Sequence, residues 1–596
     1  MRTFHVEIIK PSHYDKDGYV IQWWKAWIPS NSMACLNAIA RTSAERQVLG
    51  PDVAIEVNAY DEMNIRVPVE EISARIGRVG HSGLVCLVGV QSNQFPRAMA
   101  LARRFRAAGV PVAIGGFHVS GSLAMLKDLP AELQEALDLG IILFAGEAEE
   151  HFDSLLRDVD NGTAQSIYNC MDDLPSLQGQ TTPYLPQRLV KRYDGVVSSF
   201  DAGRGCPFQC SFCTIINVQG RKSRWRDADD IEAIVRKNHA EGIRRFFVTD
   251  DNFARNKNWE AIFDRLIALR AEGCGIDFLI QVDTLAHKIP GFVQKAARAG
   301  CKFVFVGLES VNAENLLQMK KNQNRITEYR KMFQAWKSAG VITYAGYIMG
   351  LPGDTPETLK RDIEIVQREL PVDVLEFTML TPLPGSEDHK NGVEAGIWMD
   401  PDLNKYDLES VTIAHPRMSA EAWQRAYRDI WDWYYTDAHI ERIMRRNLVY
   451  GIKPVKIWHS VLQVYGAPKF EGVHPQQCGY LRRKDRLERR ADMPRPAAAV
   501  FYPLYLAESA AKYLRFGAYA WKIHRMRKRI ARDPEAKSYS DLAITPVIEA
   551  ETETLEMFAL NDQARAAVEK ARRQAEDRRQ RHVLASKEDN PLAKAG

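Results

Sequence analysis

Short apolar runs alternate with amphipathic stretches in two separate parts of the chain, as in parallel strands joined by helical crossovers. The first part, residues 1 to about 160, contains five such runs, at 4–9, 53–60, 83–90, 110–116 and 140–146. The second part contains six, at 196–205, 243–253, 276–284, 301–310, 341–353 and 372–385. Most intervening segments carry a 3.6-residue apolar period and end near glycine, as helices do. The chain is therefore expected to be an α/β protein with two parallel sheets.

The number of strand-helix units predicts a different fold for each part. Five strands with crossovers predict a doubly wound, flavodoxin-like domain of the Rossmann type, whose ligand site lies at the carboxyl ends of its strands. Those ends are the loops at 10–30, 89–96, 115–120 and 146–149. Six units predict a partial (β/α)6 barrel of the TIM type, because a closed eight-unit barrel usually needs about 250 residues. Chemistry is then expected at the carboxyl ends of the barrel strands.

A chain of 596 residues with 45% hydrophobic residues is long enough for several domains. The pattern predicts five segments: the doubly wound domain at 1–160, a linker at 161–195, the barrel at 196–415, a helical region at 416–532 and a charged helical or disordered tail at 533–596.

The chain has no obvious export or membrane-spanning segment. Its N-terminus, "MRTFHVEIIKPSHYD", lacks a basic start followed by an apolar run, and no window reaches 18 uncharged apolar residues. Nine cysteines do not form a disulfide framework, and a formal net charge of +4 is too small for this length to indicate a nucleic-acid partner. We therefore expect a cytoplasmic protein.

The segment 499–532 is apolar and aromatic and ends in a basic cluster. Two interpretations stay open. It is either a helical cap on the barrel or an amphipathic helix that gives the protein peripheral contact with a membrane.

Three of the cysteines, Cys206, Cys210 and Cys213, lie in "GCPFQCSFC", directly after the first predicted barrel strand. A short loop lets all three sulfurs face one metal centre. Structural zinc normally takes four protein ligands, so a zinc site would need a fourth from afar, such as Cys274 or Cys301. A 4Fe-4S cluster would have one iron without a protein ligand, open to a small molecule.

This loop resembles the signature of the radical S-adenosylmethionine (radical SAM) enzymes, and "FFVTDDNF", "GLES", "GYIMGLPGDTPET" and "TPLPGS" resemble the strand ends of their barrel. The resemblance implies that Cys206, Cys210 and Cys213 bind a 4Fe-4S cluster whose fourth iron is chelated by S-adenosylmethionine (SAM). One-electron reduction of SAM then releases methionine and a 5'-deoxyadenosyl radical, which abstracts a hydrogen atom from the substrate. An electron donor such as a flavodoxin, a ferredoxin or a reductase is implied.

Several residues are candidates for SAM binding by the same resemblance: Phe212, Asp250, Asp251, Gln281, Glu309 and Gly350. Phe212 would help to place the adenine, and Glu309 would hydrogen-bond the ribose. Four of them have a structural alternative. An ion pair would explain Glu309, a turn or helix cap would explain the aspartates, and a tight turn would explain Gly350.

A doubly wound domain before such a barrel resembles the cobalamin-binding class of the family. The matching segments are "VGVQSNQFPRAMALARRFRAAGVPVAIGGFHVS" and "FAGEAEEHF". They imply cobalamin contacts from Ser92, Asn93, Gly115 and Gly116, and from His118 as a loop residue near the ligand. The Asp-x-His-x-x-Gly motif that supplies a cobalt ligand in many cobalamin proteins is missing, and "NAYDEMNI" follows the second strand instead.

This class implies methylation of an unactivated carbon on a hydrophobic, lipid-like or secondary-metabolite substrate. An oxidative cyclisation or rearrangement without methyl transfer is the first alternative. A remoter one is tRNA methylthiolation, but that needs a second cluster site, whereas Cys35 falls in a predicted helix and Cys86 in a strand.

Overall fold

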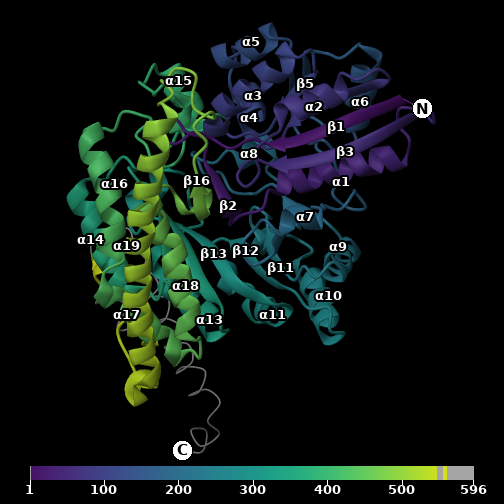
Figure 1. Cartoon of the computed structure of the whole chain (residues 1–596). Helices are drawn as coiled ribbons and strands as arrows, with labels where there is room; N and C mark the ends of the chain where they lie inside the picture. The colour runs from purple at the N-terminus through teal and green to yellow at the C-terminus, as the bar shows by residue number, and fades with distance from the viewer. Residues whose placement is uncertain (1, 547–554, 560–596) are drawn as a thin grey trace, which may run out of the picture.

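The computed structural model describes residues 2–546 and 555–559, which form two parallel sheets with their helices and a mainly helical C-terminal region (Figure 1). The first sheet has the order β3-β1-β4-β5-β6-β7, and all its neighbouring strands are parallel. Its strands are β1 (Arg2–Lys10), β3 (Val53–Asp61), β4 (His81–Leu87), β5 (Val112–Gly115), β6 (Ile142–Ala145) and β7 (Ile167–Asn169).

Helices cover both faces of this sheet. Helices α1 (Asn31–Glu45) and α6 (Phe152–Asn161) contribute to one apolar core, and α2 (Val69–Ile76), α3 (Phe95–Ala107) and α5 (Ala131–Asp138) to the other. The strand order is that of a flavodoxin-like doubly wound fold with an added edge strand. The predicted class of the N-terminal domain is confirmed.

The linker predicted at 161–195 contains two regular elements. β7 pairs with β6 and extends the first sheet to Asn169, and α7 (Gln187–Val190) follows it. Neither element was among those predicted from the sequence. A three-residue strand carries too short a pattern to be recognised from sequence.

The second sheet has the order β15-β14-β13-β12-β11-β8, so each strand lies beside its predecessor along the chain, as in a barrel. Its strands are β8 (Val197–Phe200), β11 (Arg245–Val248), β12 (Asp277–Val282), β13 (Cys301–Glu309), β14 (Ile342–Met349) and β15 (Val374–Met379). The helices that connect them include α9 (Ala228–Ala240), α10 (Trp259–Ala271), α11 (Phe292–Ala299), α13 (Ile326–Ser338) and α14 (Pro356–Glu369). This arrangement confirms the predicted partial (β/α)6 barrel.

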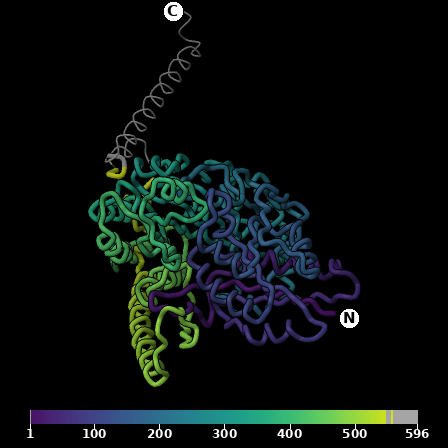
Figure 2. The backbone as a smooth tube through the Cα atoms, turned by 90° about the horizontal axis from the view of Figure 1, so that it is seen from above, coloured from purple at the N-terminus to yellow at the C-terminus, as the bar shows by residue number. Residues whose placement is uncertain are grey.

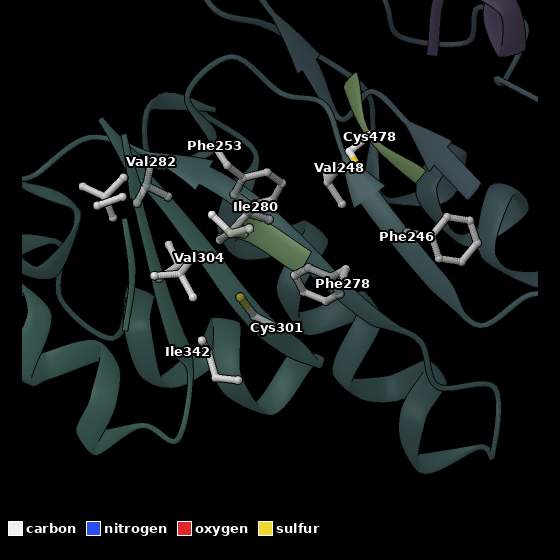
Figure 3. Packing of buried hydrophobic residues seen from close by; sticks show 14 of the residues in the cluster. Phe246, Val248, Phe253, Phe278, Ile280, Val282, Cys301, Val304, Ile342 and Cys478 are labelled. Atoms are coloured by element: carbon white, nitrogen blue, oxygen red, sulfur yellow. The ribbon is translucent and has the colours of Figure 1, made fainter. Parts of the chain in front are cut away.

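Side chains alternate along the barrel strands between a buried outer layer and a more open concave face. On β13, Val304, Val306 and Leu308 are completely buried, whereas Phe303 and Phe305 are partly exposed. The buried set belongs to the large core that the barrel shares with its helices; Figure 3 shows Val304 in this core together with Phe278 and Ile280 of β12. The partly exposed set lines the inside of the barrel.

The C-terminal region consists mainly of α16 (Ala420–Tyr434), α17 (Asp437–Val449), α18 (Pro454–Val464) and α19 (Ala498–Arg532). Its predicted helical character is confirmed, although the region also contains a strand that was not predicted. A strand, β16 (Gly479–Arg483), pairs antiparallel with β2 (Gln22–Ala26) from the loop after β1. Trp23 of β2 is buried and donates a hydrogen bond from Nε1 to the Gln477 carbonyl at 3.0 Å. This pairing ties the C-terminal region to the N-terminal domain.

The tail predicted at 533–596 falls partly outside the described residues, which omit 547–554 and 560–596. Its first part packs against the barrel: Gln334 of α13 donates hydrogen bonds to the carbonyls of Ala543 and Thr545. No helix in the described ranges is long and apolar enough to cross a bilayer.

Candidate active site

The cysteine loop lies between β9 (Gly203–Arg204) and α8 (Ile215–Val218), near the carboxyl end of barrel strand β8. Backbone hydrogen bonds fix it: Cys206 N–H donates to the Gly220 carbonyl at 3.2 Å, and Cys213 N–H donates to the Cys210 carbonyl at 3.2 Å. The loop thus lies at the end of the barrel where chemistry was expected.

The three thiols lie on one short loop, are buried or half-buried, and interact electrostatically with one another. Burial raises the pKa of Cys206 to about 11 and that of Cys213 to about 12, and a charge on Cys210 adds to both increases. Gln323 donates a hydrogen bond from Nε2 to the Cys210 sulfur at 3.3 Å. Three clustered sulfurs on one loop fit a 4Fe-4S cluster with three protein ligands.

The remote cysteines that a zinc site would need lie elsewhere. Cys301 is the first residue of β13 and Cys274 precedes β12, so both lie at the opposite end of the barrel from the loop. Among the residues that the structure describes, no group of three His, Cys, Asp or Glu side chains is close enough to hold a single metal ion. The structure therefore gives the zinc alternative no fourth ligand at either position.

The two aspartates after β11 have different partners. Asp250 is buried and accepts hydrogen bonds from the Asn252 N–H at 3.1 Å and from Asn256 Nδ2 at 2.8 Å. Asp251 accepts a hydrogen bond at 2.8 Å from the N–H of Gly205, the residue directly before Cys206. Burial raises the pKa of Asp250 to about 6, and burial together with Asp250 raises that of Asp251 to about 7. Asp250 holds the turn, whereas Asp251 contacts the cysteine loop.

Glu309, at the end of β13, forms an ion pair with Lys321. Its backbone has φ of 61°, a left-handed conformation that costs a non-glycine residue about 1–3 kcal/mol. Lys321 Nζ also lies 5.4 Å from the centre of the Phe212 ring. Gly307 makes room for this pair, because a Cβ there would lie 2.4 Å from Glu309 Oε1. The structure thus brings Glu309 and Phe212 together around a lysine that the sequence did not single out.

Gln281 and Gly350 have local structural partners. Gln281, on the concave side of β12, donates a hydrogen bond to the Asp250 carbonyl at 3.4 Å. A Cβ at Gly350 would lie 1.9 Å from the Trp423 ring, and the Gly350 N–H donates to Asp354. Glycine at 350 is therefore required by Trp423 and a tight turn, and the structure places no ligand space directly at that position.

A buried carboxyl group lies inside the barrel without a charged partner. Glu376 of β15 is 1% exposed and accepts hydrogen bonds from the Tyr344 hydroxyl and from Gln476 Nε2, the latter at 2.7 Å. Tyr344 packs edge-on against Phe305, with ring centres 5.3 Å apart. Burial raises the pKa of Glu376 to about 7. The inside of the barrel thus combines aromatic surface with a carboxyl group that is partly neutral near pH 7.

Replacing Glu376 by glutamine is expected to stabilise the protein at pH 8 and to change little at pH 4. The pKa of Glu376 in the folded state is about 7, above its ordinary value of 4.5. Between these two pH values the folded state binds more protons than the unfolded state, so the protein loses stability as the pH rises from 4.5 to 7. The variant lacks this loss, which is worth about 1–3 kcal/mol. Thermal melting of both proteins from pH 4 to pH 8 measures it, with Glu394→Gln on exposed α15 (Glu387–Glu394) as the control. Parallel pH profiles for wild type and Glu376→Gln would contradict the assignment.

A cavity of about 170 Å³ lies at the carboxyl ends of β4, β5 and β6, as predicted for the ligand site of this domain. Its lining is largely apolar and includes Leu36, Cys86, Phe144 and Phe152. Arg204, Val218 and Gln219 of the barrel domain close one side. A cavity of roughly 150 Å³ holds a benzene-sized ligand, so this one fits a single aromatic base.

The residues expected to contact cobalamin divide into two groups. Gly115 and Gly116 line the cavity. Ser92, Asn93 and His118 are buried outside its lining, and His118 Nδ1 lies 3.1 Å from Ser92 Oγ. No histidine is among the residues that line the cavity. His118 is therefore occupied by Ser92 in the core of the domain.

A network of buried charges connects this cavity to the cysteine loop. Arg204 forms ion pairs with Asp201 at 3.0 Å, with Glu147 at 2.6 Å and with Glu149 at 2.7 Å. Burial alone would raise the pKa of Glu149, but the Arg204 guanidinium outweighs burial and holds that pKa below its usual value. Arg224 also pairs with Glu147. The "GEAE" segment of the first domain is thus held by arginines that flank the cysteine loop.

Known proteins were compared with the chain. Residues 202–366 match the family model described as the radical SAM superfamily. The bacteriochlorophyllide d C-8(2)-methyltransferase of Chlorobaculum tepidum is 27% identical over 382 residues, 60% of this chain and 80% of that protein. The hopanoid C-2 methylase of Rhodopseudomonas palustris is 23% identical over 437 residues, 67% of this chain and 80% of that protein.

Among solved structures, the methyltransferase TsrM from Kitasatospora setae, described with cobalamin and a [4Fe-4S] cluster bound, superposes with a TM-score of 0.54. The match is 16% identical and covers 73% of this chain and 91% of TsrM. At this identity the match shows a common fold.

Proposed function

Because the chain belongs to the radical SAM superfamily through residues 202–366, we propose that it is a cobalamin-dependent methyltransferase that modifies an unactivated carbon of a large apolar substrate. Its relatives include methyltransferases named for bacteriochlorophyllide d and for hopanoids.

One observation carries this proposal: a single arginine connects the two cofactor sites. Arg204 lines the cavity of the first domain and lies two residues before Cys206. Between them, the Gly205 N–H is held by Asp251. A ligand in the cavity and a cluster on the loop would therefore be close neighbours, as a methyl carrier and a radical source acting on one substrate must be.

The residues on each side suit these ligands. Cys206, Cys210 and Cys213 would hold the cluster, with Asp251 and the Glu309–Lys321 pair at the position of SAM. The cavity at Gly115 and Gly116 fits the nucleotide base of a cobalamin tail by size and apolar lining. When bound, the cluster would supply the electron that cleaves SAM, and the cobalamin would carry the methyl group. A flavodoxin, a ferredoxin or a reductase would deliver the electron.

The inside of the barrel supports an apolar substrate. Phe247, Leu279, Phe303, Phe305 and Tyr344 are partly exposed on its concave side. Glu376 contacts Tyr344 in this set, and a neutral carboxyl can donate a hydrogen bond to a hydroxyl or carbonyl of the substrate. These side chains would orient a largely hydrophobic molecule with one polar substituent.

The proposal is tested by following a labelled methyl group. The chain is purified anaerobically with cobalamin and incubated with a reductant, SAM labelled in its methyl group and a lipid extract of the source cells. Mass spectrometry should find a labelled apolar product that requires both cobalamin and reductant. Label that enters no product, or enters without cobalamin, would overturn the assignment.

A further inference from the structure

The C-terminal helix α19 presents an unusual outer face. It is a single helix of 35 residues, about 50 Å long, and lies across the outside of the molecule against α17 and α18 (Figure 1). Seen from above, it lies at the edge of the body (Figure 2). One side therefore packs on the protein and the other faces outward.

The inner side of α19 is well packed. Phe501, Ile523 and Ile530 are buried. Tyr505 donates a hydrogen bond from its hydroxyl to the Arg482 carbonyl at 2.8 Å, and the Arg482 N–H donates to the Tyr513 hydroxyl at 2.9 Å. These contacts fix the rotation of the helix, so the residues on the opposite side are held outward.

The outer side carries ten exposed residues at alternating spacings of four and three, which form one stripe that winds slowly around the helix. We call these positions the outer stripe: Val500, Leu504, Ala507, Ala511, Leu514, Ala518, Trp521, Arg525, Lys528 and Arg532. The first seven are apolar and the last three are basic. Leu504 is 65% exposed, Leu514 74% and Trp521 62%. Exposed apolar surface of this extent on an ordered helix indicates a contact surface.

The charge on α19 identifies the kind of surface that it fits. The helix contains eight basic residues and one acidic residue, Glu508. Among the described residues, Arg525, Lys528 and Arg532 have no ion pair, although Arg529 pairs with Glu441. Free cations that continue an apolar stripe match a surface with both anionic headgroups and acyl chains.

We infer that the outer stripe docks the protein onto an anionic lipid membrane. A second copy of α19 fits less well. In a parallel pair, the basic ends of the two helices would lie side by side and repel each other. In an antiparallel pair, Arg525 and Arg532 would lie against the apolar half of the other helix. Lipid satisfies both halves, with Val500 to Trp521 at the acyl boundary and Arg525 to Arg532 among the headgroups. The inference does not depend on the proposed methyl transfer.

Vesicle co-sedimentation of the full chain tests this docking. The protein should sediment with vesicles of phosphatidylglycerol and phosphatidylcholine in equal amounts, less with phosphatidylcholine alone, and less at high salt. Arg525→Gln/Lys528→Gln should weaken binding about fivefold for each cation removed. Leu504→Gln/Leu514→Gln should weaken it about tenfold for each leucine.

Matched controls on other surfaces should bind like wild type. They are Val79→Gln/Val393→Gln, two exposed valines, and Arg78→Gln/Lys127→Gln, two exposed cations. Circular dichroism checks that each variant is folded.

Failure of the wild type to sediment, or equal binding by the stripe variants, would overturn the inference. A dimer in light scattering that Leu504→Gln/Leu514→Gln converts to a monomer, without vesicle binding, would assign the stripe to self-association instead. Cleavage of SAM is measured in parallel, so loss of docking is distinguished from loss of the proposed chemistry.

Discussion

Replacing Cys210 by alanine is expected to reduce SAM cleavage to background and to remove most of the bound iron. Cys210 is buried, accepts a hydrogen bond from Gln323 and interacts electrostatically with the other two thiols. Removing it leaves two sulfurs for a cluster that has only three protein ligands. Iron and sulfide analysis, together with mass spectrometry of 5'-deoxyadenosine after anaerobic reduction, measures the effect.

The matched control is Cys274→Ala. This cysteine is also partly buried but lies at the opposite end of the barrel, before β12. The control should keep the iron content and the SAM cleavage of wild type. Full cleavage by Cys210→Ala would show that the cluster is bound elsewhere.

Replacing Arg204 by methionine is expected to destabilise the protein by about 3–5 kcal/mol, because it leaves the buried Glu149 carboxylate without its cation. Asp201 and Glu147 also lose a partner, but they keep Arg226 and Arg224 respectively. The loss should appear as a lower midpoint of thermal and denaturant unfolding. It should also appear as faster proteolysis near the junction of the two domains, since the pairs join the β6–α6 loop to the cysteine loop.

A second substitution separates charge from packing. Arg204→Met/Glu149→Gln removes one unpaired carboxylate and should recover part of the loss. Replacement of Arg236, an exposed arginine of α9 paired with Glu232 and Glu272, should cost less than about 1 kcal/mol. Equal melting of Arg204→Met and wild type would show that the network does not hold the domains together.

Much of the fold could be predicted because its signals are local. The run at 301–310 corresponds to β13 (Cys301–Glu309), and the run at 276–284 to β12 (Asp277–Val282). Apolar periodicity sets which side chains a strand buries, so it is present in any single segment. The cysteine loop was recognisable for the same reason, since all three sulfurs lie within eight residues.

The parts that could not be predicted depend on contacts between distant segments. β2 pairs with β16 across more than 450 residues, and no pattern within either strand indicates its partner. Lys321 reaches Glu309 from a later turn, and Trp423 explains Gly350 from 73 positions downstream. Arg204 looked like an ordinary loop residue, although it joins the two domains. Its signal was weak but present: charged residues beside a buried strand need partners.

The central claim is that a radical SAM cluster and a cobalamin act together in this chain. The most direct test is to measure the products of SAM from the anaerobically purified, cobalamin-loaded protein after reduction, in the presence of its lipid extract. The account predicts 5'-deoxyadenosine and S-adenosylhomocysteine in the same reaction, with both lost in Cys210→Ala. 5'-Deoxyadenosine without S-adenosylhomocysteine would contradict methyl transfer and favour oxidative ring formation.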